Sequence, residues 1–329
     1  MIPAAWAALS GLPIGETADA GLINRTLLAG DPPRFVVQRV SPIFAPSVHD
    51  DIEAVTGHLE SVGMVTPRLV RTDSGDLWAA DPDGGVWRVL TFVPGRTVHR
   101  LSDPVVAREA GALVARFHVA TESLEWSYHH VRPGAHDTAL HMRRLEETYA
   151  LAGQDQSARV ADDILECWRT WSGPLDLPLR HAHGDLKISN LRFDSGGRGV
   201  CLLDLDTLSL QPMDVELGDA LRSWCNPVGE DSPQTRFDLA LFTAAMRGYQ
   251  SVRPLSEAER GGVVSGAERI ALELASRFCR DIREDCYFGW NPERFASRRE
   301  HNLFRAQGQL RLARSAREQR AAMEKVLRG

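Results

Sequence analysis

A predicted β-hairpin near the middle of the chain sets the tightest limit on its fold. Leu191–Phe193 and Val200–Leu203 are apolar and β-prone, and the DSGGRG between them is rich in turn residues. Folding the hairpin about Gly197 places Asn190 opposite Asp204. The ribbon therefore brings a side-chain amide and a carboxylate to one end of a strand pair.

The polar residues around this hairpin suit phosphoryl transfer. Mg²⁺ takes oxygen ligands and leaves several positions to phosphate and water, so Asn190 and Asp204 can hold it. In the preceding loop, HGDLKISN, Asp185 can accept the proton of an attacking hydroxyl, and Lys187 can offset the charge of the phosphoryl group. The alternative is a hairpin whose polar ends are merely solvated. The joint pattern favours kinase chemistry with Mg²⁺; ATP is the expected nucleotide, and the residues leave GTP as the alternative.

Lysine is scarce in this chain, and one lysine lies in that loop. Lys187 and Lys325 are the only lysines among 38 basic side chains. Where arginine is used almost everywhere, a retained lysine indicates a need for a compact ammonium group. We interpret Lys187 as functional and Lys325, in a helical tail, as incidental.

The pattern of apolar residues changes from strands to helices along the chain. Period-two patterns and turn signals predict strands at 24–28, 35–40, 68–72, 77–80 and 86–92. Helical patterns are predicted at 47–61, from a cap at Ser102 to about 120, at 139–152, at 158–171 and within 295–327.

These elements predict an α+β protein with two lobes. A small antiparallel-sheet lobe over residues 1–93 would bind the nucleotide. A hinge is expected at about 90–97, where PGR breaks the strand pattern. A larger, mostly helical lobe over 97–329 would carry catalysis and bind the substrate.

Composition limits the partners and the compartment. The 329 residues are 43% hydrophobic and 25% charged, which is ordinary for a globular protein of more than one core. The net charge of −6 argues against nucleic acid or anionic membranes as partners, and no segment approaches the ~18 apolar residues of a membrane span. Five cysteines without a CxxC indicate free thiols, so a cytoplasmic location is predicted.

The motifs also resemble a known family. HGDLKISN followed by LLDLD resembles the catalytic and metal-binding segments of the aminoglycoside-phosphotransferase-like kinases, which share the protein-kinase fold. Further segments spread over about residues 20–312, such as LLDLDTLSLQPMDVELGDALRSW and HNLFRAQGQL, are similar to N-acetylhexosamine 1-kinases. This narrower resemblance implies a small-molecule substrate, a hexose or N-acetylhexosamine, phosphorylated at its anomeric hydroxyl.

The resemblance assigns roles around the hairpin. It implies that Asp185 is the catalytic aspartate and that Asn190 and Asp204 are the metal ligands. Asp206 follows in the same LDLD run; either it assists the metal or the substrate, or it makes a buried hydrogen bond.

The resemblance also suggests nucleotide-binding residues in the sheet lobe. In GLINRT, which resembles a segment that covers the nucleotide phosphates, Asn24 and Thr26 can donate to phosphate. The sheet lobe contains no lysine, so the strand lysine of the wider family cannot exist here. Gln38 or Arg39 would replace it, and only one of the two can face the nucleotide. Thr91, in the strand before the hinge, is a further candidate.

The sequence leaves open which acid of the helical lobe braces the catalytic loop. In MDVELGDALRSW, three acids compete to brace the catalytic loop: Asp214, Glu216 and Asp219. We favour Asp219 as the structural residue and place Arg222 near the substrate.

For the substrate side we name His136, Asp206, Arg222 and Tyr287 as candidate contacts, since sugars are bound by polar side chains over an apolar floor. An aminoglycoside or amino alcohol is the alternative acceptor. A nucleotide-binding pseudokinase without turnover is the alternative of a different class, favoured only by the missing strand lysine.

Overall fold

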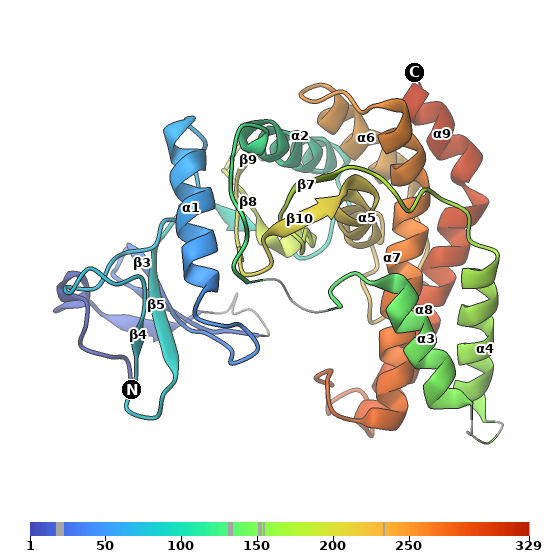
Figure 1. Ribbon diagram of the computed structural model, residues 1–329, viewed down its shortest axis with the longest axis horizontal. Coiled ribbons are helices and arrows are strands. Elements are labelled where there is room, and N and C mark those ends of the chain that lie inside the picture. The colour runs from blue at the N-terminus through green and yellow to red at the C-terminus, as the bar shows by residue number, and fades with distance from the viewer. Residues whose placement is uncertain (18–22, 131–133, 151–152, 154, 233, 329) are drawn as a thin grey trace.

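The structure, a computed structural model, describes residues 1–17, 23–130, 134–150, 153, 155–232 and 234–328. The beginning of the chain forms a five-stranded antiparallel sheet in the order β1-β2-β3-β5-β4. Its strands are β1 (Ile14–Glu16), β2 (Arg25–Ala29), β3 (Phe35–Arg39), β4 (Ala79–Ala80) and β5 (Val86–Thr91). Helix α1 (Val48–Ser61), predicted at 47–61, lies on the side of this sheet that faces the helical lobe (Figure 1).

One predicted strand of the sheet lobe does not form. Residues 68–72 run beside β5 but make only an isolated bridge, between Leu69 and Leu90. The carbonyl oxygen of Val70 accepts a hydrogen bond from the Trp6 indole nitrogen at 2.8 Å instead of from another strand. Two residues later a tight turn closes on the Thr72 hydroxyl, so the extended segment is too short for a regular ladder.

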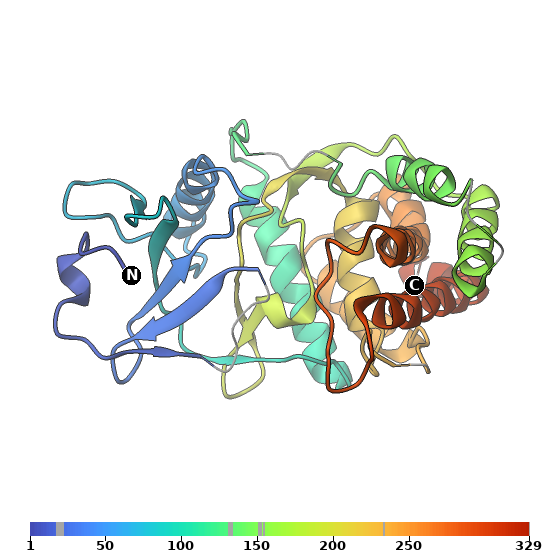
Figure 2. The same ribbon diagram turned by 90° about the horizontal axis from the view of Figure 1, so that it is seen from below.

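The rest of the chain is mainly helical (Figures 1 and 2). Its helices are α2 (Pro104–Thr121), α3 (Thr138–Tyr149), α4 (Gln156–Arg169), α5 (Met213–Trp224), α6 (Leu239–Gln250), α7 (Glu257–Glu284), α8 (Arg298–Glu318) and α9 (Arg320–Arg328). Helix α7 lies at the centre, against α3, α4, α5, α8 and α9. In the described part of the chain, no helix has both the length and the apolar run that crossing a bilayer would take.

The predicted cap of α2 is wrong by one residue. The side chain of Asp103, not Ser102, accepts the hydrogen bond from the Val105 amide at 2.8 Å. Pro104 occupies the first helical position, where its fixed φ suits the helix and its missing N–H is not needed. The position of the proline therefore assigns the cap to the residue directly before it.

Helices α5 and α7 pack backbone against backbone. A Cβ atom on Gly266 would lie 2.1 Å from the carbonyl oxygen of Asp214, and one on Gly218 would lie 2.7 Å from the carbonyl oxygen of Gly266. Only glycine permits this approach. This close approach holds α5 directly against α7.

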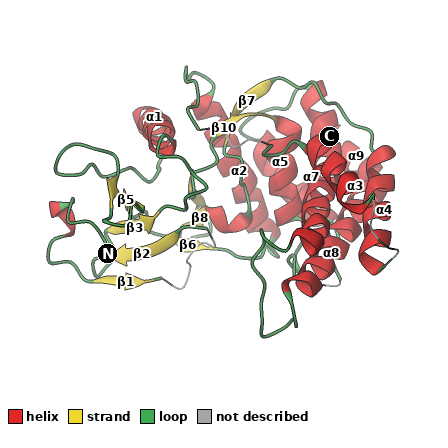
Figure 3. Cartoon of the chain, turned by 60° about the horizontal axis from the view of Figure 1, so that its bottom comes forward, coloured by secondary structure: helices red, strands yellow, loops and turns green. Residues whose placement is uncertain are grey.

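Short strands join the two lobes (Figure 3). The predicted hairpin forms β8 (Leu191–Phe193) and β9 (Gly199–Leu202), with β6 (Arg96–Thr97) paired to β8. Strands β7 (Leu179–Ala182) and β10 (Ser209–Pro212) form a separate antiparallel pair. The chain thus passes from the large sheet to the hairpin across residues 92–95. The division into lobes at residue 93 stays a prediction.

Candidate active site

Helix α5 holds the loop that follows β7 in place. The carboxylate of Glu216 accepts hydrogen bonds from the backbone amides of His183 and Gly184, at 2.8 and 3.0 Å. Glu216 is buried and lies 3.3 Å from the imidazole of His118, and although burial would raise its pKa, these bonds lower it. The residue that braces the loop is therefore Glu216, and the preference for Asp219 is corrected. The packing of α5 on α7 turns Glu216 toward the loop.

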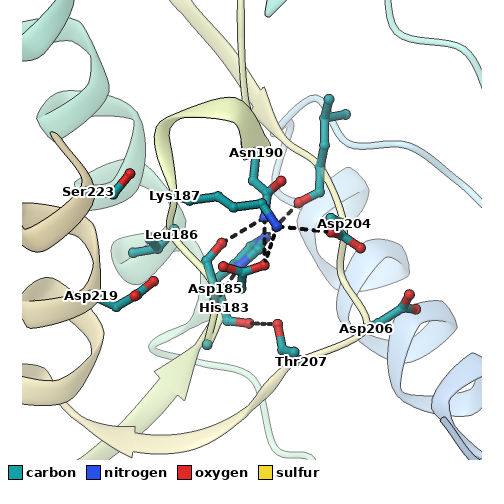
Figure 4. A network of polar contacts seen from close by, with 12 residues as sticks. His183, Asp185, Leu186, Lys187, Asn190, Asp204, Asp206, Thr207, Asp219 and Ser223 are labelled. Atoms are coloured by element: carbon teal, nitrogen blue, oxygen red, sulfur yellow. Dashed lines mark hydrogen bonds and ion pairs between the residues drawn. The ribbon is translucent and has the colours of Figure 1, made fainter. Parts of the chain in front are cut away.

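Two residues of the loop HGDLKISN, Lys187 and Asn190, converge on the carboxylate of a third, Asp185 (Figure 4). The Lys187 ammonium donates to Asp185 Oδ2 at 2.8 Å. The Asn190 amide nitrogen donates to the carbonyl oxygen of Asp185 at 2.8 Å and to its Oδ2 at 3.1 Å. Burial would raise the pKa of Asp185, but the ammonium of Lys187 outweighs it and lowers the pKa. The Asp185 side chain is therefore ionised at neutral pH.

The hairpin brings Asp204 to the same place. The register of the hairpin differs by one residue from the prediction. Leu203, not Asp204, pairs with Asn190, because the Leu203 amide donates to the carbonyl oxygen of Asn190 at 2.7 Å. Asp204 follows in a left-handed conformation with φ of 60°. Its carboxylate lies 3.8 Å from the Lys187 ammonium, which thus stands between two acids.

These groups fit a divalent cation. Because the amide nitrogen of Asn190 is used by Asp185, its Oδ1 is the atom left to bind a metal. Burial and the neighbouring Asp206 raise the pKa of Asp204, so a nearby positive charge would stabilise its ionised form. An amide oxygen and a carboxylate are ligands that Mg²⁺ accepts.

Asp206 has partners of its own. It is buried, and its carboxylate forms an ion pair with Arg88 of β5, with Arg88 Nη2 at 2.9 Å from Oδ2. The Asn24 amide nitrogen donates to the same Oδ2 at 2.6 Å. Of the two roles considered for Asp206, these contacts match the buried hydrogen-bonding one. They also give Asn24 a partner other than phosphate.

Gln38 and Arg39 lie on opposite faces of the sheet. Gln38 donates to the Thr26 hydroxyl at 3.1 Å and accepts from Arg88 at 2.9 Å, so it lies on the sheet face that holds Asp206. Arg39 points to the opposite face, where it lies 3.3 Å from Asp81. Gln38 and Thr26 are therefore the pair on the side of the sheet that faces Asp206.

The remaining nucleotide candidates are Thr91 and the GLINRT segment. The Thr91 hydroxyl, at the end of β5, accepts the amide of Arg68 at 2.9 Å. Gly21 and Leu22, which begin the GLINRT segment, lie outside the described residues.

Two of the substrate candidates, His136 and Arg222, take part in ion pairs. His136 lies 3.2 Å from the carbonyl oxygen of Gly184 and 3.3 Å from the carboxylate of Glu273. Burial alone would lower the pKa of His136, but Glu273 raises it to about 9. The cation of Arg222 pairs with Asp219 and Glu230.

Tyr287 lies outside the contacts described so far for the loop 183–190. It is half-exposed, on the connection between α7 and α8, with the guanidinium of Arg277 over its ring. The buried Trp224 donates to the carbonyl oxygen of Leu186, so it supports the catalytic loop from the core.

Asp219 is available for another partner. Its Oδ1 accepts from Arg222 at 3.0 Å, but its Oδ2 is buried and has no hydrogen-bond partner among the described residues. Figure 4 shows its carboxylate turned toward Asp185. An unpaired carboxylate oxygen beside the catalytic group suits a donor on the substrate.

The family model described as "Phosphotransferase enzyme family" matches residues 15–255. The chain belongs to this family. The chain is 28% identical over 190 residues to homoserine kinase of Gluconobacter oxydans, covering 56% of each chain. It is 29% identical over 217 residues to homoserine kinase of Acidiphilium cryptum, covering 61% of this chain and 60% of that one. The matches thus span less than two thirds of these relatives' length.

Solved structures agree in fold. An aminoglycoside phosphotransferase from Alicyclobacillus acidocaldarius superposes with a TM-score of 0.65 at 19% identity, covering 98% of this chain and 97% of that one. A microcompartment-associated aminopropanol kinase gives 0.62 at 16% identity, covering 96% and 94%. The predicted two-lobed kinase-like fold and the phosphotransferase family are therefore confirmed.

Two important residues were not predicted from the sequence. Arg88 lies inside the strand predicted at 86–92 without a role of its own, and Glu216 is one of three acids that compete to brace the loop. A signal for Arg88 was present, since it is the only charged residue within VWRVLTF. A charge in the middle of a buried strand requires a partner.

Proposed function

We propose that this protein transfers the γ-phosphoryl group of ATP to the hydroxyl of a small acceptor that also carries an amino group. The observation that carries the proposal is the set of Asp185, Lys187, Asn190 and Asp204, joined by the contacts of 2.8–3.8 Å described above. Membership in the phosphotransferase enzyme family supports it.

The chain's own residues support each step of such a transfer. Asp185, charged at neutral pH, accepts the proton of the acceptor hydroxyl as its oxygen bonds to the γ-phosphorus and the bond to ADP breaks. Lys187 stays near the transferred group and offsets its charge. Glu216 holds the loop so that Asp185 keeps its position.

Asn190 Oδ1 and Asp204 would hold a divalent cation, for which we propose Mg²⁺. Such an ion, when bound, neutralises charge on the nucleotide phosphates. An amicoumacin kinase of similar fold, at 14% identity, has been solved with AMP-PNP and Ca²⁺, which supports the choice of an adenine nucleotide and a divalent ion.

The amino group of the acceptor is proposed from the charges near Asp185. Arg222 is neutralised by Asp219 and Glu230, and His136 is paired with Glu273, so these cations have little attraction left for an anionic substrate. The free Oδ2 of Asp219 can instead accept a hydrogen bond from an ammonium group. Names of relatives and structural neighbours, homoserine kinase and aminopropanol kinase, point to amino-bearing alcohols as well.

The anomeric hydroxyl of a hexose or N-acetylhexosamine gains no support from the relatives reported above. It stays an untested prediction, as does the cytoplasmic location.

An acceptor panel tests the proposal. The protein is incubated with ATP and Mg²⁺, and ADP release is measured with homoserine, 1-amino-2-propanol, an aminoglycoside, glucose and N-acetylglucosamine. Propane-1,2-diol is the matched acceptor without the amino group. We expect turnover on an amino alcohol, at least tenfold slower on the diol, and loss of turnover in Asp185→Asn. Turnover confined to uncharged sugars contradicts the amino group. Nucleotide binding without turnover on any acceptor contradicts the enzyme and favours a binding module.

A further inference from the structure

A buried arginine crosses from the sheet to the catalytic lobe. Arg88 lies in the middle of β5 and is only 2% exposed. The register of the sheet places it beside Gln38, which lies beside Thr26. Their side chains form a polar row across the inner face of the sheet, with bonds of 2.9 Å from Arg88 to Gln38 and 3.1 Å from Gln38 to Thr26. The row ends on Asp206 of the other lobe.

Among the described residues, the side chains that donate to Asp206 come from the sheet lobe. The two terminal nitrogens of Arg88 each bond to a different carboxylate oxygen. The Asn24 amide adds a third bond, at 2.6 Å, and its own Oδ1 is fixed by the Ser41 amide at 2.8 Å. A bidentate guanidinium defines both the position and the rotation of a carboxylate. The backbone at Asp206 is therefore positioned by the sheet.

That backbone carries the proposed metal ligand. Asp204 lies two residues before Asp206 and has the left-handed φ of 60°, a conformation that requires support from its surroundings. On its other side the chain is anchored where the His183 ring meets the carbonyl oxygen of Leu203 at 2.8 Å. The Arg88 contact and the His183 contact thus flank Asp204.

We infer that Arg88 is a positioning residue for the divalent cation: by holding both oxygens of Asp206 it keeps Asp204 in the orientation that binds the ion together with Asn190. The inference rests on the proposed function, because it concerns the ion of that reaction. The inference also makes metal binding depend on the contact between the lobes, because Asp204 is correctly oriented only when the sheet lobe contacts Asp206.

A simpler alternative is that the Arg88–Asp206 pair only stabilises the fold. Removing one member of a buried ion pair is strongly destabilising, so loss of activity alone would not distinguish the two roles. Metal affinity does distinguish them, because a purely structural contact would leave it unchanged in the folded variant.

The experiment measures Mn²⁺ binding to the full-length protein in the presence of ADP, by the electron paramagnetic resonance signal of free Mn²⁺. The variants are Arg88→Met, Asp206→Asn and their combination. The exposed Arg71, which pairs with Glu53 on the outside of the same lobe, provides the control Arg71→Met. We expect Arg88→Met to weaken Mn²⁺ binding at least tenfold and Asp206→Asn at least threefold. The double variant should bind Mn²⁺ no more weakly than Arg88→Met does, since both substitutions break the same contact. The control should bind Mn²⁺ as the unchanged protein does.

Circular dichroism and thermal unfolding show whether each variant is folded. If Arg88→Met does not fold, Arg88→Lys replaces it: a lysine keeps the charge but cannot hold both oxygens, and we expect at least a threefold loss. A folded Arg88 variant that binds Mn²⁺ within twofold of the unchanged protein overturns the inference. Absence of Mn²⁺ and ADP binding in the unchanged protein overturns both the inference and the proposed function.

Discussion

The two sides of the site are built from different kinds of contact. On the hairpin side, Asp185, Lys187 and Asn190 come from one loop and bond directly to one another. On the sheet side, the corresponding contacts join residues far apart in the chain, such as Arg88 with Asp206 and Asn24 with Asp206. The first set forms once the loop is closed, whereas the second forms only when the lobes dock.

This difference separates chemistry from positioning. Changes on the hairpin side should act on the transfer step, and changes on the sheet side should act on nucleotide binding, metal binding and stability. The predictions below test that separation, beginning with the largest effect.

Asp185→Asn should remove most of the activity. Loss of the general base is expected to lower kcat by about 10³-fold, while ATP affinity stays within threefold. ADP release on the best acceptor and ATP binding by calorimetry measure the two effects. The exposed Asp176→Asn is the matched control. Activity above a tenth of normal in Asp185→Asn would show that the hairpin side does not carry the chemistry.

Glu216→Gln should weaken both the loop and the fold. The glutamine keeps one acceptor for the amides of His183 and Gly184 but loses the charge near His118. We expect the free energy of unfolding to fall by about 3 kcal/mol and kcat to fall more than tenfold. Denaturant unfolding and turnover at saturating substrates measure these. A stability loss with unchanged kcat would limit Glu216 to the fold.

His136 should make stability depend on pH. Its folded pKa of about 9 exceeds the ordinary 6.5, so its contribution is fully present below about pH 6.5 and is lost as pH rises through 9. At about 1.4 kcal/mol per pKa unit, the contribution is on the order of 3 kcal/mol at most. Unfolding of the unchanged protein and of His136→Gln between pH 6 and 9.5 should converge at high pH. The half-exposed His129→Gln is the control, and parallel curves for His136→Gln would contradict the Glu273 pair.

Asp219→Asn should act on the acceptor and not on the nucleotide. Loss of a charged hydrogen bond to an ammonium group is expected to raise the acceptor KM by about tenfold, since such bonds contribute about 1.5–3 kcal/mol. The KM for ATP should stay within twofold. Propane-1,2-diol, which has no ammonium, should lose much less. An equal loss on amine and diol would place Asp219 outside acceptor recognition.

The smallest expected effect is seen by comparing substitutions at two neighbouring residues of β3, Gln38 and Arg39. Gln38→Leu breaks the row between Thr26 and Arg88 and should raise the KM for ATP by about threefold, the equivalent of about 0.7 kcal/mol. Arg39→Leu removes a partly exposed ion pair with Asp81, worth at most about 1 kcal/mol, and should leave that KM within experimental error. The reverse result would move the nucleotide to the other face of the sheet.

Most regular elements could be predicted from local patterns. The helix at 47–61, the hairpin and the run of helices after the hinge region appear where periodicity and turn residues place them. The predictions were wrong where the role of a residue depended on its contacts with residues far along the chain. Glu216 and Asp219 lie three residues apart on one helix, so periodicity alone cannot tell which one braces the loop. The hydrogen bonds that Glu216 accepts from the amides of His183 and Gly184 decide it.

The same limit applies to the sheet. Alternation indicates that Gln38 and Arg39 face opposite sides, but not which side meets the catalytic lobe. Register across β3 and β5, and the burial of Arg88 against Asp206, supply that answer.

The sequence by itself determined the catalytic loop and the hairpin, because their polar groups are brought together by short-range chain geometry. Only the tertiary structure decided the contacts of Glu216, Asp219, Asp206 and Arg88. Each of these charges is placed by partners far along the chain, and a buried charge takes its role from the group it meets once the helices and lobes have packed.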